Sequence, residues 1–179
     1  MISGRRLIVG VTGGIAAYKT AGLVSQLVQS DADVTVVMTR SSQEFVGQAT
    51  FAALTAKPVA TELFDSHYPL GAHIELAQNA DLLCVAPASA RCLARFAQGT
   101  SDDLLSTLYL CFGGPILLAP AMNVQMWENP AVQRNVQRLR DDGVNFVGPE
   151  DGWLSCRQSG VGRMVDPEQI AASIADLLS

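Results

Sequence analysis

Five short apolar runs recur along the chain and alternate with helix-like segments. The runs have the aliphatic and β-branched composition of strands that are buried on both faces. They cover residues 7–11, 34–38, 82–86, 116–119 and 144–147. The segments with helical patterns cover residues 15–29, 44–54, 89–97, 102–112, 131–141 and 167–178. This alternation predicts a doubly wound parallel sheet with right-handed crossovers, a three-layer α/β/α fold of flavodoxin-like or Rossmann-like type.

A chain of 179 residues is the right size for one compact domain, so we expect a single domain over residues 1–179. The hydrophobic fraction is 49% and the charged fraction only 16%. Either a face hidden in an oligomer or a thick core between two helical layers explains this composition. The longest irregular segment covers residues 148–166, and a glycine-spaced loop of this length predicts a flexible flap over a site.

Charge and cysteine spacing exclude several classes of function. The net charge is −5 and the chain has no extended basic cluster, which argues against nucleic acid as a partner. No apolar segment is long enough to span a membrane or to serve as a signal core, so we expect a soluble cytoplasmic protein. The cysteines lack metal-ligand spacing, and we expect no metal site. Cys84 and Cys111, in apolar segments, are expected to be inert packing residues.

A glycine pair follows the first predicted strand. Gly13 and Gly14 stand where the strand turns into a helix, and glycines there let backbone N–H groups approach an anion. A simple tight turn explains the pair equally well. The turn matches neither the dinucleotide fingerprint nor the Walker A sequence, so neither a dinucleotide nor a nucleoside triphosphate is indicated.

The next strand ends also carry small or hydrogen-bonding residues. Thr39 and Ser41 suit a phosphate or ribityl chain, although helix capping is the explanation that local sequence favours. Residues 87–90 follow the third strand. Asn123 follows the fourth, where it either caps a helix or contacts a ligand. Because the carboxyl ends of parallel strands meet at one edge of a sheet, their convergence predicts a binding site there.

Six motifs carry a resemblance to a known family. They are residues 13–19 (Gly-Gly-Ile-Ala-Ala-Tyr-Lys), 73–76 (His-Ile-Glu-Leu), 87–90 (Pro-Ala-Ser-Ala), 102–107 (Asp-Asp-Leu-Leu-Ser-Thr), 120–123 (Pro-Ala-Met-Asn) with Met126-Trp127, and Cys156 with 160–164 (Gly-Val-Gly-Arg-Met). In this order they span nearly the whole chain. The sequence resembles the homo-oligomeric flavin-containing cysteine decarboxylases, and within them the phosphopantothenoylcysteine decarboxylase branch.

The resemblance implies an FMN site. The residues that would bind FMN are Gly13, Gly14, Ile15, Thr39, Ser41, Phe45, Ser89, Ala90 and Ala121. It also implies catalytic roles for His73 as the active-site base, for Asn123 as the residue that holds the substrate carboxylate, and for Cys156 as a late proton donor.

The resemblance further implies a substrate and an assembly. The activity would be that of a carbon-carbon lyase that decarboxylates 4′-phosphopantothenoylcysteine to 4′-phosphopantetheine in coenzyme A biosynthesis, through thioaldehyde and enethiolate intermediates. The substrate-binding residues would be Asn123, Met126, Arg157 and Arg163. In this family the pocket forms between subunits of a homotrimer, and trimers often build a homododecamer. Two alternatives stay open, a peptidyl-cysteine decarboxylase and a non-catalytic flavin-binding regulatory protein.

The sequence departs from the family pattern at two places. Arg91-Cys92 stand where the family usually has Asn-Thr, in a region implied to contact the flavin. Arg157 stands where a glycine usually follows the flap cysteine. The longer side chain either changes the flexibility of the flap or contacts the substrate phosphate.

Overall fold

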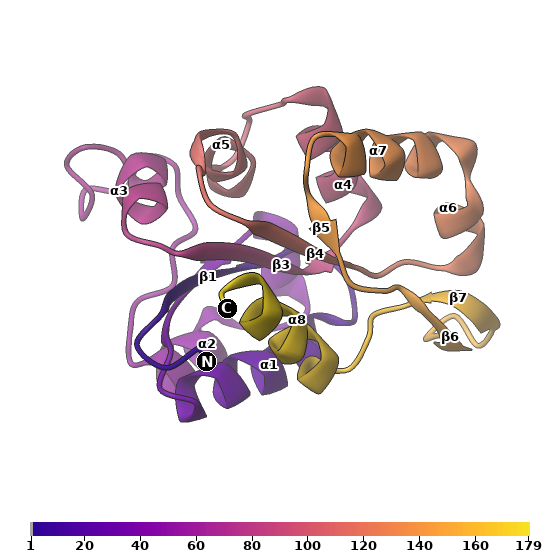
Figure 1. The fold of residues 1–179 in the computed structure, drawn as a ribbon, viewed down its shortest axis with the longest axis horizontal. Coiled ribbons are helices and arrows are strands. Elements are labelled where there is room, and N and C mark those ends of the chain that lie inside the picture. The colour runs from indigo at the N-terminus through magenta and orange to yellow at the C-terminus, as the bar shows by residue number, and fades with distance from the viewer. Residues whose placement is uncertain (1) are drawn as a thin grey trace.

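A computed structural model describes residues 2–179 and shows a parallel sheet between two layers of helices (Figure 1). The strands lie in the order β2-β1-β3-β4-β5, which confirms the predicted doubly wound fold. Their bounds are β1 (Arg6–Val11), β2 (Asp33–Met38), β3 (Leu82–Ala88), β4 (Ile116–Pro120) and β5 (Asn145–Phe146). The helices are α1 (Ala17–Gln29), α2 (Gln48–Thr55), α3 (Ala72–Gln78), α4 (Ala90–Gln98), α5 (Leu104–Cys111), α6 (Val124–Glu128), α7 (Pro130–Asp141) and α8 (Pro167–Leu177).

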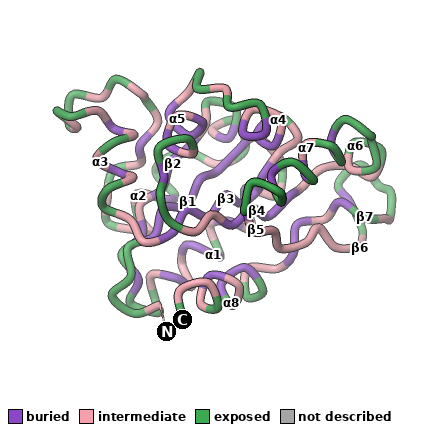
Figure 2. The backbone as a smooth tube through the Cα atoms, turned by 45° about the horizontal axis from the view of Figure 1, so that its top comes forward, coloured by how far each residue is buried: buried purple, intermediate pink, exposed green. Residues whose placement is uncertain are grey.

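Each face of the sheet has its own hydrophobic core. Residues from α1, α2 and α8 pack against one face, and residues from α3, α4, α5 and α7 pack against the other. Strand β3 lies at the centre of the sheet and is buried along its whole length, as its continuous apolar run predicts (Figure 2). The thick core between two helical layers therefore accounts for part of the high apolar fraction.

Two buried threonines join the first crossover to the centre of the sheet. The Thr12 hydroxyl donates to the Pro87 carbonyl at 2.6 Å, and the Thr20 hydroxyl donates to the Ala86 carbonyl at 2.7 Å. Both hydroxyls are almost completely buried, so each would be costly to leave without a partner. These bonds fix the turn after β1 against the end of β3.

The structure corrects three of the expectations from sequence. Residues 148–166 are not irregular, because β6 (Glu150–Trp153) and β7 (Ser159–Arg163) pair there as an antiparallel hairpin. The segment 44–54 is not one helix: a 3₁₀ turn at Arg40–Glu44 precedes α2. Cys111 is exposed at the end of α5 and is not a core residue. Within residues 2–179, none of the helices combines the length and apolarity that crossing a membrane requires.

Candidate functional site

A cavity of about 710 Å³ lies between the carboxyl ends of β1, β3 and β4 and the β6–β7 hairpin. Most of the residues predicted to bind a ligand line this cavity. They are Gly13, Gly14, Ile15, Ser89, Ala90, Ala121, Asn123, Met126, Cys156 and Arg163. The convergence of strand ends that the sequence predicts is therefore present in the folded chain.

The turn after β1 forms the floor of the cavity. A Cβ atom added to Gly13 would lie 2.5 Å from the Ser41 hydroxyl oxygen, closer than any side chain tolerates. Glycine is thus required here by a close approach of two loops. At Gly14 the nearest atom to an added Cβ is on Pro87 at 3.9 Å, so this position leaves room above the turn.

Asn123 caps helix α6. Its side-chain oxygen accepts a hydrogen bond from the Met126 backbone N–H at 2.8 Å, so the helix-cap interpretation is confirmed. The carboxamide N–H₂ group has no hydrogen-bond acceptor within residues 2–179. An amide can donate and accept at the same time. The cap therefore orients the side chain and leaves its donor available to a ligand in the cavity.

The hairpin forms the opposite wall and is joined to the sheet edge by backbone contacts. The Met122 N–H donates to the Gly162 carbonyl at 3.0 Å. Gly162 has φ of +152°, and a Cβ atom there would collide with the Met122 carbonyl oxygen. Only glycine allows this close passage of β7 beside the segment before Asn123. The cavity side of the hairpin carries Cys156, whose thiol is exposed.

Charged side chains hold the base of the hairpin. Arg163 lies 3.4 Å from Glu150 and 3.1 Å from Asp166, and Lys19 of α1 donates to Asp166 at 2.8 Å. The hydrogen bond from Lys19, its charge and that of Arg163 hold the pKa of Asp166 below its ordinary value. Arg163 thus borders the cavity with its charge already paired to two carboxylates.

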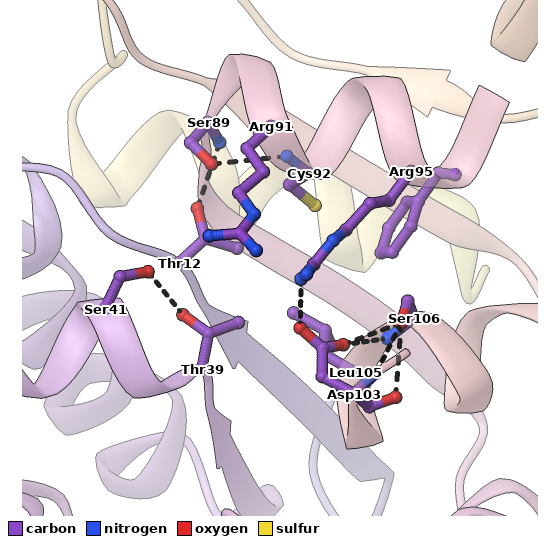
Figure 3. Close-up of a pocket in the computed structure, with 11 residues that line it drawn as sticks. Thr12, Thr39, Ser41, Ser89, Arg91, Cys92, Arg95, Asp103, Leu105 and Ser106 are labelled. Carbon is purple, nitrogen blue, oxygen red and sulfur yellow. Dashed lines mark hydrogen bonds and ion pairs between the residues drawn. The ribbon is translucent and has the colours of Figure 1, made fainter. Parts of the chain in front are cut away.

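A small hollow adjoins the cavity on the side of β2 (Figure 3). Ser89 lines both, and Thr39 and Ser41 lie across the hollow with their hydroxyl oxygens 3.3 Å apart. Thr39 does not cap the turn that follows it with its side chain, so the capping expectation is wrong for this residue. Its hydroxyl contacts the Val11 carbonyl at 3.3 Å instead.

The four cysteines differ sharply in environment. Burial raises the pKa of Cys84 to about 12 and raises that of Cys92 as well. Cys111 is exposed on α5, and its thiol donates to the His73 carbonyl at 3.4 Å, outside the cavity. Cys156 is the cysteine that borders the cavity among residues 2–179. The same span holds no cluster of side chains suited to a metal ion.

Three predicted site residues line neither the cavity nor the hollow. His73 is on α3, which lies at the opposite end of the molecule from the hairpin (Figure 1). Its Nδ1 atom is buried and has no hydrogen-bond partner within residues 2–179. Phe45 and Arg157 are both exposed and line neither the cavity nor the hollow. One chain therefore does not bring His73 together with Asn123 and Cys156.

Nine cavity residues were not predicted as site residues, among them Tyr18, Lys19 and Trp153. Tyr18 and Lys19 stand within the first quoted motif, so the signal for them was present but was not used. Trp153 lies on β6 and is 65% exposed. No local pattern indicates its position, because the hairpin itself was not expected.

The profile of the Flavoprotein family matches residues 1–179, the full length of the chain. The chain belongs to the Flavoprotein family. The family likeness extends to curated proteins, including the coenzyme A biosynthesis bifunctional protein CoaBC of Haemophilus influenzae. That protein is 42% identical over 179 residues, which are 99% of this chain and 45% of the relative. The chain thus spans less than half the length of this relative.

Solved structures of other proteins have the same fold. A mutant PPC decarboxylase complexed with pantothenoylaminoethenethiol superposes with a TM-score of 0.88 at 28% identity, covering 98% of each chain. The FMN-dependent cysteine decarboxylase SpaF superposes with a TM-score of 0.85 at 30% identity, covering 99% of this chain and 97% of that one. The likeness therefore includes the hairpin as well as the sheet.

Proposed function

We propose that this chain catalyses the FMN-dependent decarboxylation of 4′-phosphopantothenoylcysteine to 4′-phosphopantetheine, a step of coenzyme A biosynthesis. The observation that carries the proposal is the cavity itself, which Asn123 and Cys156 line together with the glycine turn at Gly13 and Gly14. The likeness to CoaBC and to a PPC decarboxylase supports the choice of substrate.

The residues present fit FMN. The cavity volume of about 710 Å³ lies within the usual range for cofactor sites. Its glycine turn, the apolar side chains of Ile15 and Met126, and the hydroxyl-lined hollow beside it suit a planar ring with a polar, anionic tail. When bound, the flavin supplies a two-electron acceptor and then a donor for the thiol end of the substrate.

Asn123 would hold the carboxylate that is lost. Its oxygen is engaged by the Met126 N–H, so the group that remains free is the N–H₂ donor, which matches a carboxylate acceptor. The hydrogen bond to the helix backbone keeps the side chain in one orientation. Met126 would close the apolar side of the site next to that carboxylate.

Cys156 would complete the reaction. Loss of carbon dioxide would leave an enethiolate, and a carbon of this group would need a proton, together with the two electrons that a bound flavin would supply, to yield the saturated thiol. The buried cysteines cannot reach the cavity, whereas the exposed thiol of Cys156 borders it. A chain that lacks this proton donor would stop at the enethiol.

His73 would come from a second copy of the chain, because α3 and the hairpin lie at opposite ends of one molecule. Exposed apolar side chains occur at both ends: Ile15, Tyr18 and Trp153 around the cavity, and Leu70 and Ile74 beside His73. A head-to-tail contact between these two different surfaces generates a closed ring when the rotation permits. We therefore propose a homo-oligomer built on trimers, with His73 as the base that accepts the substrate thiol proton.

The test is to purify the chain, record its flavin spectrum, and incubate it with 4′-phosphopantothenoylcysteine. We expect release of carbon dioxide and formation of 4′-phosphopantetheine. Cys156→Ser is expected to release carbon dioxide while accumulating the enethiol. Turnover of a peptide that ends in cysteine, without turnover of the small substrate, would contradict the proposal. A protein that cannot bind FMN would also contradict it.

Mixing two inactive variants tests the shared site. His73→Asn and Cys156→Ser are each expected to form no saturated product. If His73 and Cys156 of one site come from different copies, random reassembly restores both in about a quarter of the sites of a mixed ring. Recovery of saturated product in the dissociated and reassociated mixture is the expected result. No recovery in mixed oligomers would contradict a site shared between copies.

A further inference from the structure

Arg91 lies at the second position of α4 and its guanidinium group points into the hollow between Thr12 and Ser41 (Figure 3). The side chain is exposed and forms no ion pair with any carboxylate within residues 2–179. Arg95, one turn further along α4, is different because Asp102 and Asp103 both pair with it. Arg91 thus brings an uncompensated positive charge to the hollow.

Hydroxyl groups surround this charge. Ser89 accepts a hydrogen bond from the Cys92 N–H at 3.3 Å, which leaves its own O–H free to donate. Ser41 has its oxygen 3.3 Å from that of Thr39, and at most one of these two hydroxyls donates to the other. The hollow therefore combines hydroxyl donors with a guanidinium group, a donor set that suits a phosphate.

The remaining charges around the hollow are balanced. Asp103 is the carboxylate in its lining, and it accepts from Arg95 and from the Ser106 backbone N–H. Asp102 faces the same arginine from the outside. These contacts leave Arg91 as the charge that is available to an incoming anion.

The hollow and the large cavity are adjacent parts of one surface. Ser89 lines both, and the Gly13 turn that floors the cavity packs directly on Ser41 of the hollow. A single ligand can place an apolar ring in the cavity and an anionic end in the hollow. The family resemblance does not assign this role to Arg91, since the family usually has asparagine at this position.

We propose that Arg91 binds the phosphate of the flavin cofactor and makes the chain prefer FMN over riboflavin. The inference rests on the proposed function, because it takes FMN as the occupant of the cavity. Riboflavin has the same ring and ribityl chain without the phosphate. A contact to the phosphate therefore changes the affinity for FMN and leaves that for riboflavin unchanged.

The experiment compares flavin binding by the wild-type chain, Arg91→Gln and Arg91→Lys after removal of bound flavin. Titration with FMN and with riboflavin, followed by flavin fluorescence, gives two dissociation constants for each protein. We expect Arg91→Gln to raise the FMN constant about tenfold, as for loss of one exposed charge-assisted hydrogen bond, with riboflavin unchanged. Arg91→Lys is expected to retain part of the preference. Added salt is expected to weaken FMN binding more in the wild type than in Arg91→Gln.

Arg134→Gln is the matched control, because Arg134 is exposed on α7 and lines neither the hollow nor the cavity. An Arg91→Gln protein with the wild-type ratio of the two constants would overturn the inference and leave the proposed function standing. Equal weakening of FMN and riboflavin would overturn it too, because the effect would then be on the fold. A wild-type chain that binds neither flavin would overturn the proposed function itself.

Discussion

The two walls of the cavity are built in different ways. The sheet-edge wall continues strands whose last residues, such as Val11, Ala88 and Ala119, are fully buried. The hairpin wall is mostly exposed or half-buried (Figure 2), with Trp153 65% exposed. A wall fixed by core packing keeps its shape without a ligand, whereas an exposed hairpin opens at a lower free energy. The sheet-edge wall is therefore suited to stable binding of a cofactor, and the hairpin wall is suited to the entry of a substrate.

The sheet-edge wall is expected to be the more sensitive to a single added atom. Gly13→Ala places Cβ against Ser41 in a packed turn, and we expect it to lower the free energy of unfolding by about 2 kcal/mol. If the same strain falls on the cofactor site, FMN binding weakens about thirtyfold. Urea unfolding and a flavin titration measure the two effects.

Gly47→Ala is the control for this change, since a Cβ atom there meets nothing within 4 Å. We expect its unfolding free energy to stay close to that of the wild type. If Gly13→Ala were as stable as Gly47→Ala, the turn would be free to relax, and the contrast between a rigid and a mobile wall would be lost.

The second prediction separates capping from ligand binding at the same wall. Asn123 caps α6 and Asn129 caps α7 through similar bonds, to the Met126 N–H at 2.8 Å and the Ala131 N–H at 2.9 Å. Mutation of either residue to alanine is expected to lower the unfolding free energy by about 1 kcal/mol. Only Asn123→Ala is expected to lower kcat/KM, by about tenfold or more, through loss of a hydrogen bond to the substrate carboxylate. Equal activity of the two variants would mean that Asn123 caps α6 and does not bind the substrate.

The difference between the walls also explains what could be predicted from the sequence. The sheet-edge wall can be predicted from local patterns. Buried parallel strands appear in the sequence as apolar runs, and the carboxyl ends of parallel strands lie at the same edge of the sheet. These patterns place Asn123 and Ser89 at the ligand-binding edge of the sheet. The hairpin was missed because β6 and β7 contain glycine and charged residues and have no apolar alternation. Its strands pair with each other and contact the backbone at Met122, and no local pattern in the sequence indicates either contact.

The place of His73 could not be derived from patterns within one chain either. The motif around it indicated a functional histidine, but α3 was not among the predicted helices. His73 is distant in sequence from Asn123 and Cys156. In the folded chain its helix, α3, lies at the opposite end of the molecule from the hairpin. If the site is shared between two copies, as we propose, the order of elements along a single chain carries no signal of it.

The third prediction tests the ionic attachment of the hairpin. The folded-state pKa of Asp166 is held below the ordinary value of 3.8 by Lys19 and Arg163. Its contribution to stability is therefore present above pH 3.8 and disappears as the pH falls through the folded-state value. We expect Asp166→Asn to be less stable than the wild type near neutral pH by at most about 1 kcal/mol, since the carboxylate is half exposed and screened by salt. The difference should vanish in acid, and a difference that persists at low pH would assign the effect to something other than the charge.

The smallest expected effect concerns the tip of the hairpin. Arg157 has φ of +64°, a left-handed conformation that glycine adopts without strain, and the related family usually has glycine there. Arg157→Gly is expected to raise the unfolding free energy by less than about 1 kcal/mol, because the relieved strain is partly offset by the greater freedom of glycine in the unfolded chain. Ala56→Gly is the matched control, since Ala56 has φ of +55° at the end of α2, far from the cavity lining.

The same pair of variants decides between backbone and side-chain roles for Arg157. Because Arg157 lies outside the cavity lining of a single chain, we expect KM for 4′-phosphopantothenoylcysteine to change less than about twofold in Arg157→Gly. A KM raised well beyond that, with Ala56→Gly unchanged, would show that the arginine contacts the substrate phosphate when the hairpin closes or when a second copy is in place. In that case the exposed wall supplies a charged contact that the buried wall lacks, and the contrast between them extends from mobility to substrate recognition.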